Sequence, residues 1–75
     1  MNEYDRRKNI LDFIVSEMER AEDIDTINKL YRQARAWNRF DTISERKVPD
    51  KHNPVYVQFN ETLKIIRNEY RAKLK

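Results

Sequence analysis

The residues best suited to bind a ligand lie in one segment, Thr26 to Phe40, which carries four cations and no acid. At about 100° per residue, a polar row recurs on one helix face at spacings of four, three and four: Asn28, Arg32, Arg35 and Arg39. Such donors suit phosphates and base edges in a DNA major groove, or an acidic protein surface. The simpler interpretation is a solvated face, paired or not with acids of the same chain.

A second basic row is predicted near the C-terminus. Lys64, Arg67, Asn68, Arg71 and Lys75 fall along one flank of a helix expected over residues 54–73. The candidate residues for binding a partner or nucleic acid are therefore Asn28, Arg32, Arg35, Arg39, Lys64, Arg67 and Arg71.

Catalytic motifs are missing from the sequence. There is no glycine for a phosphate-binding loop and no cysteine for nucleophilic chemistry or a thiolate metal site. The single histidine, His52, stands beside Lys51 in a predicted loop. The acids Glu17, Glu19 and Glu22 point to different sides of a helix, so a solvated face explains them better than acid–base catalysis. We expect no enzyme activity, no metal and no cofactor.

The basic segment must be positioned by a helix that is also apolar. Its opposite face carries Ile27, Leu30, Tyr31, Ala34 and Trp37. Asp23 can accept hydrogen bonds from the first-turn amides, and Asp25 adds favourable negative charge there. These signals predict a helix over residues 23–40.

Another helix, nearer the N-terminus, is predicted over residues 2–21. Its apolar arc is close to 200° wide on the same wheel, with Phe13 and Val15 at the edges, and its opposite face is acidic. So broad an arc indicates packing between two neighbours, or packing on one neighbour with the rest left for a partner. The acidic face is Asp5, Asp12, Ser16, Glu19 and Asp23.

The periodic pattern breaks after Phe40. If the helix continued, Asp41 would fall inside the apolar arc, and a buried unpaired carboxylate costs several kcal/mol, so we expect a loop over residues 41–53. Thr42 and Glu45 have capping-box spacing, which allows a short helical piece over residues 42–47.

Asn53 and Pro54 then form a good helix start. Residues 55–59 would also suit a short strand, but the apolar spacing from Tyr56 to Leu74 favours a helix over residues 54–73.

Three helices with short connections predict an all-α fold, a small three-helix bundle that runs up-down-up within one domain of residues 1–75, with room for one short extra helical turn. The expected core is Ile14, Met18, Leu30, Ala34, Trp37, Phe59, Leu63 and Ile66. The four residues Ile24-Asp25-Thr26-Ile27, which open a helix after an amphipathic one, resemble the corresponding point in the nucleoid-associated modulators of the Hha family. That resemblance implies an all-α fold and action through protein partners.

The expected function is that of a small non-catalytic regulatory binding protein or inhibitor that docks on a protein partner. Aromatic residues that a small core does not enclose are the candidate apolar interface: Tyr4, Phe13, Phe40 and Tyr56. The alternative is nucleic-acid binding by the two basic rows, and a homodimer is left open. The sequence has no membrane-length apolar run and no signal peptide, so we expect a cytoplasmic protein without membrane contact.

Overall fold

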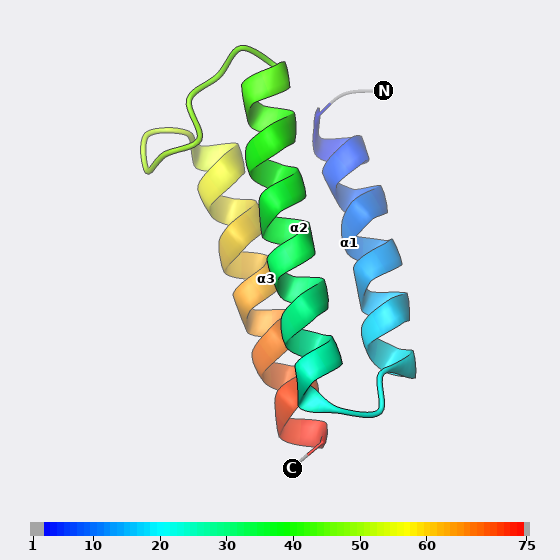
Figure 1. Cartoon of the computed structure of the whole chain (residues 1–75). Helices are drawn as coiled ribbons and strands as arrows, with labels where there is room; N and C mark the ends of the chain where they lie inside the picture. The colour runs from blue at the N-terminus through cyan, green and yellow to red at the C-terminus, as the bar shows by residue number, and fades with distance from the viewer. Residues whose placement is uncertain (1–2, 75) are drawn as a thin grey trace.

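Three helices form the whole fold in the computed structural model, which describes the backbone of residues 3–74 and the side chains of residues 5–74. Helix α1 spans Glu3–Arg20, α2 spans Ile24–Ser44 and α3 spans Pro54–Lys73, and no strand occurs among these residues. Each helix packs against the other two, and successive helices run in opposite directions (Figure 1). The predicted all-α bundle is confirmed.

Local signals define the starts of α2 and α3. The Asp23 carboxylate accepts a hydrogen bond from the Thr26 amide at 2.7 Å, and the Asn53 side chain accepts one from the Tyr56 amide at 3.2 Å. Pro54 occupies the first turn of α3, where its missing N–H costs nothing. Both predicted caps are confirmed.

The predicted end of α2 is wrong. The helix runs through Asp41 to Ser44, so the connection is residues 45–53 and the suggested extra piece at 42–47 is not a separate helix. The predicted capping box is also absent, because the Thr42 hydroxyl donates back to the Asn38 carbonyl at 2.7 Å inside the same helix.

Helix α2 stops in a left-handed turn made without glycine. Arg46 has φ 62°, the Lys47 amide donates to the Thr42 carbonyl at 3.1 Å, and the Arg46 amide donates to the Ile43 carbonyl at 2.9 Å. This is the Schellman pattern of helix termination, which places a side chain where glycine is usual.

The core lies where the three helices meet. Its buried apolar residues are Ile14, Met18, Ile27, Ala34, Phe59 and Leu63. Leu30, Trp37 and Ile66 of the predicted core are only partly buried against it, and Ile27 is a buried member that was not on the predicted list. Because Phe13 is 59% exposed while α1 packs on both other helices, the wide apolar arc of α1 serves two neighbours and leaves one edge uncovered.

Candidate functional site: a basic groove and an exposed apolar patch

The two predicted basic rows meet along one side of the molecule. Helices α2 and α3 lie side by side and antiparallel (Figure 1), and a groove of about 550 Å³ between them is lined by Arg35 from α2 and by Lys64 and Arg67 from α3. We call this the basic groove. Its full lining is Tyr31, Arg35, Tyr56, Val57, Asn60, Glu61, Lys64 and Arg67.

Tyr31 organises the centre of the basic groove. The guanidinium carbon of Arg67 lies 4.3 Å from the centroid of the Tyr31 ring, and that of Arg35 lies 5.6 Å from the same centroid. One aromatic ring therefore holds cations from two helices by cation–π attraction.

The cations of the basic groove have no ion-pair partner within residues 5–74. Among residues 5–74, no ion pair joins Arg35, Lys64 or Arg67 to a carboxylate, and Arg67 instead donates to the neutral side chain of Asn68 at 3.0 Å and 3.2 Å. Glu61 is the one acid in the lining. The groove thus presents three cations against one carboxylate.

The remaining predicted binding residues extend the rows but do not line the groove. Arg32 and Arg39 are exposed on α2, whereas Asn28 and Arg71 are half-buried. The Nε atom of Arg71 is buried and has no hydrogen-bond partner in the described part of the chain. Among the described side chains, no ion pair links Arg32 or Arg39 to the acidic face of α1. The alternative that these arginines pair with acids of the same chain is therefore not supported by any contact.

The predicted apolar interface residues separate into different places. Phe40 is 75% exposed and Phe13 is 59% exposed, whereas Tyr56 is half-buried in the basic groove. The side chain of Tyr4 lies outside the described residues. Ile43, which was not predicted, is also exposed and stands one turn after Phe40. We call Phe40 and Ile43 the apolar patch of α2.

A buried polar network lies near the C-terminal end of α2. The sequence did not predict it. Arg7 of α1 donates from Nε to the Asn38 side chain at 3.0 Å, and from Nη2 to Thr42 and Glu45, each at 3.0 Å. Its Nη1 atom lies 3.6 Å from the Asp41 carboxylate, which also pairs with Arg6. We call Arg7, Asn38, Asp41, Thr42 and Glu45 the Arg7 network.

The Arg7 network extends to the third helix. The Asn38 amide donates to the Tyr56 carbonyl and to the Asn60 side chain, both at 3.1 Å. A signal for it was present in the sequence, because Asn38, Asp41 and Thr42 follow Ala34 at four, seven and eight residues and so continue its face with polar side chains.

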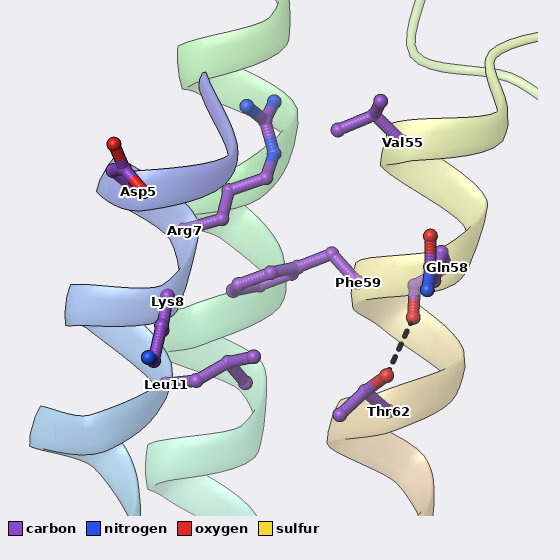
Figure 2. A pocket seen from close by; sticks show the side chains of 8 residues that line it. All are labelled: Asp5, Arg7, Lys8, Leu11, Val55, Gln58, Phe59 and Thr62. Carbon is purple, nitrogen blue, oxygen red and sulfur yellow. Dashed lines mark hydrogen bonds between the residues drawn. The ribbon is translucent and has the colours of Figure 1, made fainter. Parts of the chain in front are cut away.

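A pocket of about 270 Å³ lies between α1 and α3 (Figure 2). The Phe59 ring reaches from α3 toward α1 between Arg7 and Leu11, with Val55 above it, and Thr62 donates to the Gln58 carbonyl at 2.9 Å on the α3 side. Asp5 and Lys8 line the α1 side. Since the rim carries both charge signs, this pocket favours no particular ligand charge.

Among the described side chains, the pKa values of Asp23 and Tyr70 depart from their ordinary values. The Thr26 amide hydrogen bond lowers the pKa of Asp23. Burial, followed by a hydrogen bond to Glu19 at 3.0 Å, raises the pKa of Tyr70. Neither residue lines the basic groove, so these shifts report helix capping and helix contact rather than a reactive site.

No cluster of three or more potential metal-binding side chains occurs among the described residues. In the same part of the chain, none of the helices has the length and apolar character needed to cross a membrane.

Comparison with protein-family models, with curated proteins and with solved structures gives no match. The four-residue resemblance to the Hha family therefore gains no support from these comparisons.

Proposed function

We propose that this protein is a small non-catalytic regulator or inhibitor that docks on a protein partner through the exposed side of α2. The observation that carries the proposal is the apolar patch of α2, where Phe40 is 75% exposed beside Arg39 and one turn before Ile43. Exposed aromatic residues and arginines in one place are characteristic anchors of protein interfaces. The missing catalytic motifs favour binding over catalysis. The lack of cysteine is compatible with a reducing cytoplasm.

Capture from a lysate of the source cells tests this function. The double variant Phe40→Ser, Ile43→Ser should lose a partner that the wild-type chain captures stoichiometrically, and its helical circular dichroism should not change because both side chains are already exposed. Ile65→Ser is the matched control, since Ile65 is 59% exposed on α3. Equal capture by the double variant and the wild type would contradict the proposal.

A second candidate function, nucleic-acid binding, is favoured by the meeting of both basic rows at the basic groove. If Arg32, Arg35 and Arg39 neutralise phosphates, affinity should fall steeply with salt, and each Arg→Ala change should reduce the log–log salt slope by roughly one. A gel-shift series on the wild type and the triple variant measures this. No shift even at low salt would eliminate this candidate.

A further inference from the structure

The basic groove is organised to accept an anion before any ligand arrives. The guanidinium carbons of Arg67 and Arg35 lie 4.3 Å and 5.6 Å from the centroid of the same Tyr31 ring. The ring therefore keeps the two cations close to each other. Side chains already held in place lose less conformational entropy when they bind a ligand. Two guanidiniums from different helices are thus positioned to contact neighbouring anionic groups.

Hydrogen-bond donors dominate the groove as well. Asn60 uses its side-chain oxygen to accept from Asn38 at 3.1 Å, which leaves its own N–H groups for a ligand. Lys64 and the two guanidiniums add further charged donors, while Glu61 is the one carboxylate acceptor of the lining. The ligand that fits this lining carries several acceptor oxygens and negative charge.

The spacing of the groove cations on α3 suits a helical ligand. The groove lies between two antiparallel helices (Figure 1), and two of its cations, Lys64 and Arg67, stand three residues apart on α3, across from Arg35 of α2. Carboxylates spaced three and four residues apart on a partner helix recur with the same rise of about 1.5 Å per residue. A helix laid along the groove can therefore meet several cations in register.

A protein ligand fits better than nucleic acid. Two guanidiniums lie against the Tyr31 ring, where a base would otherwise stack. We propose that the basic groove binds an acidic helix of a protein partner, with carboxylates bridging Arg35 and Arg67. This inference rests on the proposed function and names the chemistry of the partner.

Titration with a defined peptide tests the inference. The probe is an alanine-rich helical peptide of about 20 residues with glutamates three and four residues apart on one face, compared with the same peptide carrying glutamines. Nuclear magnetic resonance of the full chain should show saturable shifts at Tyr31, Asn60 and the Arg35 and Arg67 side chains with the glutamate peptide alone.

Matched variants separate a specific site from general attraction. Arg35→Gln with Arg67→Gln should weaken binding about tenfold, whereas Arg20→Gln with Lys51→Gln removes the same charge elsewhere and should change it less than about twofold. Equal losses in the two double variants would overturn the inference. Saturable binding of a single-stranded DNA oligonucleotide in the groove without peptide binding would overturn it in favour of nucleic acid.

The two proposals fail separately. If partner capture depends on Phe40 and Ile43 but the glutamate peptide produces no saturable shift, the acidic-helix inference is wrong and the proposed function stands. If the peptide binds the groove while no partner is captured, the chemistry of the groove is supported and docking through the apolar patch is wrong.

Discussion

At the residue scale, the most consequential side chain is Arg7. It is almost fully buried, yet all three of its guanidinium nitrogens face polar partners on α2. Burying a charge is favourable only when its donors are satisfied, so the network constrains geometry more than it adds stability. Asn38 accepts from Arg7 and donates to Tyr56 and Asn60 of α3. Arg7 therefore helps to align all three helices at this end of the bundle.

Replacing Arg7 should be strongly destabilising. Arg7→Met removes the hydrogen bonds that hold the Arg7 network together and one of the two ion-pair partners of the buried Asp41 carboxylate. This should lower the free energy of unfolding, measured with urea, by about 3 to 5 kcal/mol. Adding Asp41→Leu should recover part of that loss, because it removes a buried carboxylate whose remaining partner is the partly exposed Arg6. A double-mutant cycle with purely additive effects would show that the two residues are not coupled.

Arg46 should be a position where substitution stabilises the protein. Its φ of 62° is unfavourable for a residue with a β-carbon and costs glycine nothing. Arg46→Gly should therefore raise the free energy of unfolding by about 0.5 to 1 kcal/mol, seen as a higher Tm in thermal unfolding. Lys47→Gly, one residue later and outside the left-handed region, is the control and should give no such gain.

At the element scale, the sequence predicted helix starts better than helix ends. Helix α3 matches its predicted range because Asn53 and Pro54 are local signals that need no distant contact. The prediction that α2 ends at Phe40 was wrong. It assumed that Asp41 would be buried if the helix continued, and Asp41 is indeed buried. Its partners Arg6 and Arg7 lie about 35 residues earlier in the chain, and no local pattern reveals such a pairing.

The Asp23 cap of α2 should make the free energy of unfolding fall at acid pH, where its carboxylate becomes protonated. The Thr26 amide lowers the folded-state pKa of Asp23 below 3.8, so the carboxylate contributes its stability above about pH 4 and loses it as pH falls through the lowered value. Asp23→Asn keeps a capping oxygen without a titrating group. The difference in Tm between wild type and Asp23→Asn should therefore shrink as pH falls from about 5 to 2. A difference independent of pH would contradict the assignment.

At the scale of the whole molecule, each basic row was predictable from one helix, but their meeting was not. Helical spacing places Arg35 on one face of α2 and Lys64 with Arg67 on one flank of α3. Whether those faces adjoin depends on how each helix is rotated about its axis, which the core and the Arg7 network determine together. The basic groove and its aromatic centre at Tyr31 thus arise only from the assembled bundle.

The small core makes the whole bundle sensitive to a single cavity. A chain of 75 residues is expected to have a stability of about 4 to 11 kcal/mol, and Leu63 is fully buried at the centre of its core. Leu63→Ala should cost about 2 to 5 kcal/mol, because the bundle loses apolar burial and gains a cavity. Ile65→Ala, two residues along α3, removes an exposed side chain and should change the free energy of unfolding by less than about 0.5 kcal/mol. Urea unfolding followed by circular dichroism compares the pair, and similar losses for both would mean that Leu63 does not occupy the core.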